Sequence, residues 1–277
     1  MPRHSSTLMA DSDSAYKKLN LPWYRRLVVQ ERQFTKRGVV KAFMNWSGGK
    51  DAALSLHRCL AMKHLEVGCL FTNKVAPTNR VSMHGVRWEL IQAQAASIGL
   101  PLHHALLPLE PGSDVYEEEL SRRVNGFKEL GYTTSVYGDI YLEDVKRYRE
   151  AEMSKLGMSC LFPLWKEAPG ELMSEFLGLG FKAIVVCVNS SKLDPRFCGR
   201  LIDKEFIRDL PPEVDVCGEN GEFHSFVFDG PIFKWPVPFH KGGQTLVNYA
   251  SPRELHASEL PLPQRIDFIY TDLLPVL

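Results

Sequence analysis

Short apolar runs alternate with segments of helical spacing between residues 39 and 188, and this alternation limits the fold more than any other feature. The runs that predict strands are 39–46, 67–72, 102–107, 133–137, 160–163 and 181–188. The segment 85–98 places Val86, Leu90 and Ala93 at helical spacing and precedes Gly99 and Pro101, which predicts a helix and its end. Such alternation is typical of βαβ units, so we expect an α/β fold, a parallel sheet with helices on both faces.

The chain divides by composition into three parts. Residues 1–37 are polar, then basic, and lack an apolar period, so we expect a flexible N-terminal extension. Residues 38–189 carry the alternation and form the first expected domain. From 190 to 277 prolines interrupt the pattern, and a helix at 201–210 and a strand at 223–228 predict a smaller C-terminal α+β region.

Composition narrows the class of protein. With 33 basic and 33 acidic side chains the chain is neutral, so we do not expect it to bind nucleic acid through its overall charge. No apolar run approaches the ~20 residues of a membrane span. The six cysteines form no CxxC pair, which argues against a zinc ribbon and favours reduced thiols in a cytoplasmic protein.

A glycine-containing loop follows the first predicted strand and precedes a helix. It consists of Ser47, Gly48, Gly49, Lys50 and Asp51. Two glycines allow close approach of a ligand, and free amides at a helix start attract anions, so the loop suits phosphate. The alternative is a simple strand-to-helix turn with Asp51 as N-cap. Because we expect the loop to lie exposed at the sheet edge, Gly48→Val should block phosphate without disturbing the fold.

Parallel sheets of this kind bind ligands beyond the carboxyl ends of their strands, which here lie after Trp46, Thr72 and Tyr137. Near these ends stand two further motifs. His84 and Arg87, where the second helix opens, suit contacts to a nucleotide, or are an ordinary surface helix start. Gly138 and Asp139 suit a metal or a substrate amine, or are an ordinary turn.

The C-terminal region contains Glu219, Glu222 and His224 around two glycines. Side chains alternate along a strand, so Glu222 and His224 should share a face and form an acid–base or substrate-binding pair. We expect this segment to fold over the sheet edge toward Ser47, with His224 as the base because its ordinary pKa lies near neutrality. Ordinary surface residues remain the alternative. For Arg147, Arg149 and Glu150 we expect a solvated helix face rather than a place in the site.

The loop resembles the pyrophosphate loop of N-type ATP pyrophosphatases, which have an adenine nucleotide alpha hydrolase-like, Rossmann-like fold. That family usually has Ser or Thr where this chain has Ala52, so one phosphate-binding hydroxyl is missing. Together with the strings at 82–87, 138–140, 162–165 and 218–225, the loop resembles the diphthine–ammonia ligase family over residues 39–233. The strings at 142–144 and 148–150 are similar to those of bacterial-type members.

The resemblance implies an ATP-dependent ligase that adenylates a carboxylate, releases pyrophosphate and forms an amide with ammonia. It implies that residues 38–189 are the ATP-binding domain and that residues 190–277 lie on the acceptor-substrate side. It implies that ATP contacts Ser47, Gly48, Gly49, Lys50, Asp51, His84, Arg87, Gly138 and Asp139. It also implies Mg²⁺ at Asp51 and Asp139, and catalysis by Asp51, Glu219, Glu222 and His224. The acceptor is a small molecule or a modified protein side chain, diphthine in the family, and a homodimer is possible. A tRNA-modifying enzyme and a non-catalytic adenine-nucleotide-binding protein remain alternatives.

Overall fold

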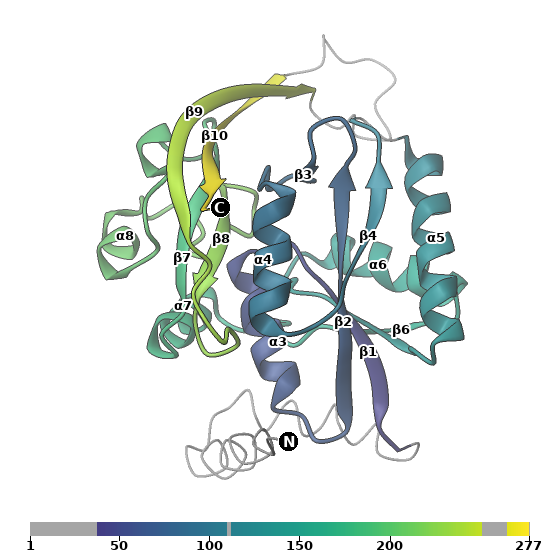
Figure 1. The fold of residues 1–277 in the computed structure, drawn as a ribbon. Coiled ribbons are helices and arrows are strands. Elements are labelled where there is room, and N and C mark those ends of the chain that lie inside the picture. Colours follow the sequence, from purple (N-terminus) through teal and green to yellow (C-terminus); the bar gives the residue numbers. More distant parts are fainter. Residues whose placement is uncertain (1–37, 110–111, 251–264, 277) are drawn as a thin grey trace.

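The computed structural model describes residues 38–109, 112–250 and 265–276, so the expected N-terminal extension of 1–37 lies outside the described residues. Figure 1 shows its elements. The strands are β1 (Val40–Asn45), β2 (Leu65–Val75), β3 (Arg80–Val81), β4 (Leu102–Leu107), β5 (Thr134–Val136), β6 (Ser159–Leu161), β7 (Lys182–Asn189), β8 (Phe223–Asp229), β9 (Phe239–Ala250) and β10 (Arg265–Pro275). The helices are α3 (Lys50–Leu60), α4 (Trp88–Ile98), α5 (Ser113–Glu129), α6 (Glu143–Lys155), α7 (Pro169–Gly178) and α8 (Lys204–Asp209), with a 3₁₀ turn at Pro195–Phe197.

The first sheet is the expected parallel one. β1 pairs in parallel with β2 on one side and β5 on the other, while β4 extends the sheet beyond β2 and β6 beyond β5. The short β3 adds an antiparallel pair at the end of β2. The chain thus runs outward from β1 in one direction and then in the other, so the strand order reverses between β1 and β5. A reversal of this kind leaves a crevice for ligands beyond the carboxyl ends of both strands.

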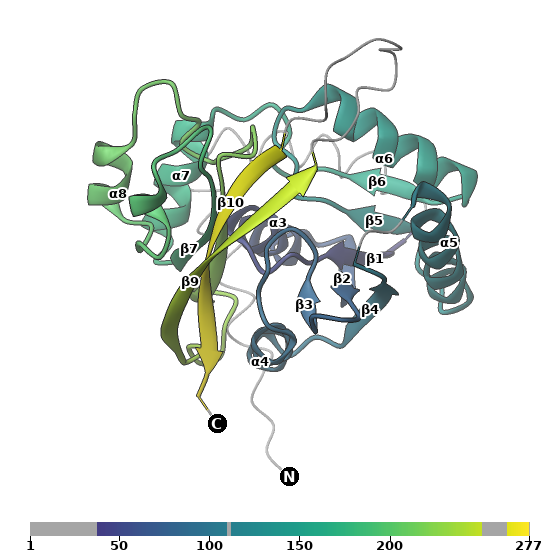
Figure 2. The same cartoon turned by 90° about the horizontal axis from the view of Figure 1, so that it is seen from above.

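The centre of this sheet is covered on both faces, which explains why β1 reads as a continuous apolar run. Alternate side chains of β1 enter different core clusters: Ala42 and Met44 one cluster, and Phe43 the other. Figure 2 shows α5 and α6 on one face of the sheet, and α3 between the first sheet and β7 to β10 on the other.

The second sheet is antiparallel, in the order β8-β7-β10-β9. The expectation that the strand at 181–188 closes the parallel sheet is therefore wrong, because β7 lies inside the second sheet. Both positions bury a strand on two faces, and an apolar run does not distinguish them. β9 and β10 were not expected from the sequence at all. One core cluster includes residues of β1, α3, α4, β7 and β8, so the two sheets share a core.

The cysteines and the lengths of the helices were both the subject of predictions from composition. All six cysteines are free thiols, and five of them are buried. Within the described part of the chain, every helix is too short or too polar to cross a membrane.

Arg58 on α3 provides a test of the packing, because its side chain is 1% exposed. It donates to the Pro163 carbonyl and to both carboxylate oxygens of Glu175 on α7. Arg58→Ala removes a buried cation and leaves both partners without it, so we expect a loss of about 3 kcal/mol in the free energy of unfolding, measured with urea.

The matched control is Arg122, which pairs with Glu119 but is 59% exposed. Arg122→Ala should change the free energy of unfolding by no more than about 0.5 kcal/mol. Equal losses in the two variants would contradict the buried tie between α3 and α7.

Candidate active site

A cleft of about 370 Å³ lies where the strand order of the first sheet reverses. That volume lies within the range of small-molecule sites. Its walls come from the ends of β1, β2 and β5, the turn before α4, helices α5 and α6, and the start of β8 with the loop before it. The lining residues central to its chemistry are Asn45, Ser47, Gly49, Lys50, Asp51, Asn73, His84, Tyr116, Tyr137, Asp139, Arg149, Glu219, His224 and Ser225.

The loop after β1 is less open than its sequence suggested. Gly48 is buried at φ +81°, and a Cβ there would lie 2.7 Å from Ile91 Cδ1 and 2.8 Å from Gln94 Oε1. The expectation that Gly48 is exposed and open to phosphate is therefore wrong, since its neighbours belong to α4. The glycine is needed for the left-handed turn and for packing.

Of two backbone amides in the loop, one has its partner within the loop and the other has its partner on β8. The Gly49 amide donates to Ser47 Oγ at 3.3 Å, and the Lys50 amide donates to Ser225 Oγ on β8 at 3.1 Å. Gly49, not Asp51, is the N-cap of α3, and no side chain caps it in that position. The N-terminus of α3 thus faces the cleft with its partial positive charge.

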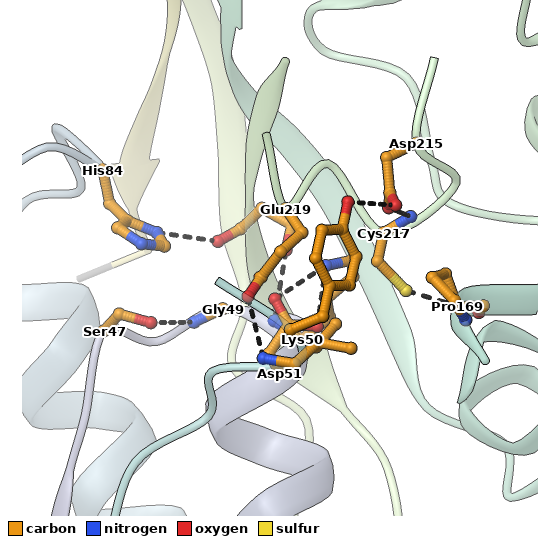
Figure 3. A network of polar contacts seen from close by, with 12 residues as sticks. Ser47, Gly49, Lys50, Asp51, His84, Pro169, Asp215, Cys217 and Glu219 are labelled. Atoms are coloured by element: carbon orange, nitrogen blue, oxygen red, sulfur yellow. Dashed lines mark hydrogen bonds and ion pairs between the residues drawn. The ribbon is translucent and has the colours of Figure 1, made fainter. Parts of the chain in front are cut away.

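Lys50 and Asp51 form an ion pair at the start of α3, with Nζ 2.8 and 2.7 Å from the two carboxylate oxygens. Burial acts to lower the pKa of Lys50, but Asp51, Cys217 and Glu219 together outweigh it and the pKa is raised. Burial also raises the pKa of Asp51, against the opposing effect of Lys50. The lysine charge is therefore retained at the cleft. Figure 3 shows this pair with Ser47, Gly49, His84 and Glu219.

Gly138 and Asp139 follow β5 on the opposite side of the reversal. A Cβ at Gly138 would lie 3.0 Å from the Asp51 carbonyl carbon, so the glycine permits close contact with α3. Asp139 pairs with Arg149 of α6, at 2.8 Å from Oδ2 to Nε and 3.0 Å from Oδ1 to Nη2. The guanidinium also stacks over the Tyr137 ring, 4.5 Å from its centroid. Arg149 lines the cleft, so the solvated helix face proposed for it is wrong.

His84, in the turn between β3 and α4, lies beside His224 of β8, with ring centroids 4.5 Å apart. His84 Nδ1 lies 3.3 Å from the Ser225 carbonyl oxygen. Burial lowers the pKa of His84 to about 4, and burial, His84 and Lys50 together hold the pKa of His224 well below its usual value. Both rings are therefore neutral at pH 7. His224 is a weaker base than its ordinary pKa led us to expect.

Glu219 and Glu222 have different surroundings although they are close in sequence. Glu219 lines the cleft, and its Oε1 accepts a hydrogen bond from the Ile140 amide at 2.8 Å. Burial raises the pKa of Glu219 to about 7, with a smaller contribution from Asp51.

Glu222 is 4% exposed and is not among the residues that line the cleft. Its Oε1 accepts from the Asp215 amide at 3.1 Å and from Asn220 Nδ2 at 3.2 Å, so it holds the preceding loop together. β8 begins at Phe223, and Glu222 precedes the strand, so the expectation of a shared strand face with His224 is wrong.

Arg87, like Gly48 and Glu222, is an expected site residue that does not line the cleft. It is the N-cap residue of α4. Its guanidinium donates to both oxygens of Asp272 on β10, at 3.0 and 2.7 Å. Arg80 reaches the same carboxylate at 2.9 Å. Arg87 therefore ties α4 to the second sheet.

Several cleft residues belong to no sequence motif. Asn45 ends β1 and bonds Ser135 Oγ and the Val136 carbonyl through Nδ2. Asn73 lies near the end of β2, Tyr116 lies on α5 among acidic residues, and Tyr137 directly follows β5. Only their place at strand ends, or on the helix faces beside them, could have identified them.

The side chains present fit a magnesium ion carried mainly by the phosphates of a nucleotide. Asp51 and Asp139 both line the cleft, but each already has a cationic partner. Across residues 38–109, 112–250 and 265–276, no group of three His, Cys, Asp or Glu side chains is arranged to hold a metal. Mg²⁺ commonly takes one or two carboxylates together with substrate phosphates, and this cleft offers that set.

The strand-order reversal, the loop and the helix start define a nucleotide-binding α/β protein. Its sequence matches the diphthamide synthase N-terminal domain over residues 40–160 and the diphthamide synthase C-terminal domain over residues 168–245. The chain belongs to the diphthamide synthase family. The membership in a ligase family expected from the motifs is thereby confirmed.

Curated relatives carry the name diphthine–ammonia ligase. The one from Mus musculus is 27% identical over 253 residues, covering 82% of this chain and 94% of the relative. That from Danio rerio is 26% identical over 211 residues, covering 68% and 82%. That from Homo sapiens is 26% identical over 213 residues, covering 68% and 78%.

The domain boundary expected after residue 189 stays a prediction. The two domain matches leave a gap at 161–167, and β7 belongs to the second sheet. Both observations favour a boundary in that gap. The bacterial type of the chain likewise stays a prediction.

Gly48 gives a direct test of how the loop is packed. Gly48→Ala adds a Cβ against Ile91 and Gln94, whereas Gly131→Ala adds one at a similar φ of +83° with nothing within 4 Å. We expect Gly131→Ala to lose about 1–2 kcal/mol from its left-handed backbone, and Gly48→Ala a further ~1–3 kcal/mol from overpacking. Equal losses by urea unfolding would mean that the loop is loosely packed.

Glu219 predicts a pH dependence of stability. Its pKa is raised from 4.5 to about 7, so the folded chain binds a proton more tightly than the unfolded chain. The stability associated with that proton is present at low pH and is lost as pH rises through this window. Glu219→Gln keeps the acceptor for Ile140 but cannot ionise, so its melting temperature should fall less than the parent's between pH 4.5 and 7.

The control is Glu143→Gln, because the hydrogen bond from Lys166 lowers the pKa of Glu143. Ionised Glu143 stabilises the folded chain above the ordinary pKa of the residue. The melting temperature of Glu143→Gln should therefore fall more than the parent's between pH 4.5 and 7. Parallel pH curves for the parent and Glu219→Gln would contradict the raised pKa.

Proposed function

We propose that this protein is an ATP-dependent amide ligase that works through an acyl-adenylate. The observation that carries the proposal is the meeting of the loop Ser47–Asp51 with Glu219 and His224 in one cleft. The loop suits phosphates, and Glu219 and His224 supply groups for proton transfer beside them. Membership in the diphthamide synthase family supports the same chemistry.

ATP is the nucleotide we propose for the cleft. The Gly49 amide, the Ser47 hydroxyl and the start of α3 would bind the phosphates that leave as pyrophosphate. Lys50 would supply positive charge, which implies that phosphate competes with Asp51 for its ammonium group. Asp51 and Asp139 would help to hold Mg²⁺, which when bound neutralises charge on the phosphates.

The reaction has two displacements. An oxygen of the acceptor carboxylate attacks the α-phosphorus, an O–P bond forms, and the bond to pyrophosphate breaks. Ammonia then attacks the acyl carbon, a C–N bond forms, the bond to AMP breaks, and nitrogen loses a proton. Adenylation is needed because a free carboxylate is a poor electrophile.

Glu219 is the group that we propose to accept the proton. Its pKa near 7 gives it both protonation states at neutral pH, whereas burial and neighbouring charge keep His224 neutral and weakly basic. His84 and His224 would then form a neutral wall of the site. Glu222 would not contact the substrate; its hydrogen bonds would hold the 215–220 loop, which carries Glu219, in place.

The acceptor that we propose first is diphthine, the compound in the names of the relatives. Arg149 and Tyr137, beyond the loop at the β5 side of the cleft, are candidates to contact it. An acceptor other than diphthine would leave the nucleotide chemistry unchanged.

Product analysis tests the proposal. With ATP, Mg²⁺, ammonium and a diphthine-containing protein, we expect AMP and pyrophosphate in equal amounts, separated by anion-exchange chromatography. Glu219→Gln should bind ATP within a few-fold of the parent and lose most amide formation, whereas Glu143→Gln, which is exposed far from the loop, should keep it. ADP and orthophosphate as products would contradict the mechanism, and ATP binding without turnover would favour a nucleotide-binding protein.

A further inference from the structure

We propose that Gln94 is a positioning residue that orients the peptide bond between Gly48 and Gly49, so that the Gly49 amide faces the phosphates. The inference rests on the proposed function, because it assigns the task to the same loop. Gln94 does not line the cleft and no motif singled it out.

Gln94 is 0% exposed, and its side-chain amide has three partners on three segments. Nε2 donates to the Gly48 carbonyl at 3.0 Å and to the Val227 carbonyl at 2.6 Å. Oε1 accepts from Trp46 Nε1 at 2.8 Å. The end of β1, the loop and β8 therefore meet at one side chain of α4.

The orientation of this amide is fixed by its partners. An indole Nε1 only donates and a carbonyl only accepts, so Trp46 must face Oε1 while Gly48 and Val227 face Nε2. Turning the amide over would oppose like groups at all three contacts. Asparagine is too short by one methylene, and an ionised glutamate has no donor for either carbonyl.

The consequence for the loop follows from peptide geometry. The Gly48 carbonyl accepts from Gln94 and also from the Val227 amide at 2.9 Å, so it points toward α4 and β8. The C=O and N–H of a trans peptide point in opposite directions. The Gly49 N–H must therefore point the other way, toward Ser47 Oγ and the cleft that Gly49 lines.

The experiment uses Gln94→Met, which keeps the side-chain length and removes both donors. Without them only the Val227 amide holds the Gly48 carbonyl, so the peptide turns over more readily, and we expect the KM for ATP and the Kd for pyrophosphate to rise about tenfold. The KM for the acceptor should stay within twofold of the parent, because the acceptor does not contact this peptide.

The matched control is Ser97→Ala, on the same helix and equally buried. Ser97 bonds the backbone of Trp235 and does not contact the loop. Both variants should melt at lower temperature, but only Gln94→Met should weaken pyrophosphate binding. An unchanged pyrophosphate Kd in folded Gln94→Met, or an equal rise in Ser97→Ala, would overturn the inference.

Trp46→Phe provides a second, milder variant should Gln94→Met not fold. It removes one of the three hydrogen bonds and keeps an aromatic ring, so the pyrophosphate Kd should rise by a few-fold. A parent protein that binds neither ATP nor pyrophosphate would refute the proposed function. A parent that binds both, with Trp46→Phe and Gln94→Met binding equally well, would refute only the role of Gln94.

Discussion

The structure of the cleft depends on the direct bonding of β8, from the second sheet, to the loop that follows β1. The Val227 amide donates to the Gly48 carbonyl, and Ser225 Oγ accepts from the Lys50 amide. These bonds join the loop to a strand that is about 180 residues later in the chain. They also explain why His224 and Glu219 line the same cleft as the loop, since β8 and the segment before it are held against it.

The charge of each ionisable group in the cleft depends on the groups beside it. The two cations that line it, Lys50 and Arg149, pair with Asp51 and Asp139 within the described part of the chain. Paired ions keep their charge in a partly buried site, while the two histidines, which lack anionic partners, lose theirs. Burial raises the pKa of Glu219 to about 7 against the effect of the hydrogen bond from the Ile140 amide, so this carboxyl group is close to its protonation midpoint at neutral pH. A polyphosphate entering this cleft would meet fixed cations and no fixed histidine charge.

The parallel sheet could be predicted from the sequence because its strands are short apolar runs separated by helices of regular spacing. The loop at Ser47, and the approach of Glu219 and His224 to it, could also be predicted. The sheet membership of β7 could not, because an apolar strand reads alike in either sheet. Glu222 was misplaced because β8 begins one residue later, at Phe223, so the two-residue alternation of strand side chains does not extend to it. Gln94 carried no signal, since its three partners come together only through tertiary contacts.

The account is tested most directly by exchange of labelled pyrophosphate into ATP. The parent protein is incubated with ATP, Mg²⁺, labelled pyrophosphate and a diphthine-containing protein, with ammonium left out. If the loop holds pyrophosphate beside a reversible acyl-adenylate, label should enter ATP only when the acceptor is present, and added ammonium should divert the adenylate to amide. No exchange under these conditions, from a protein that forms amide once ammonium is added, would contradict adenylation at this cleft.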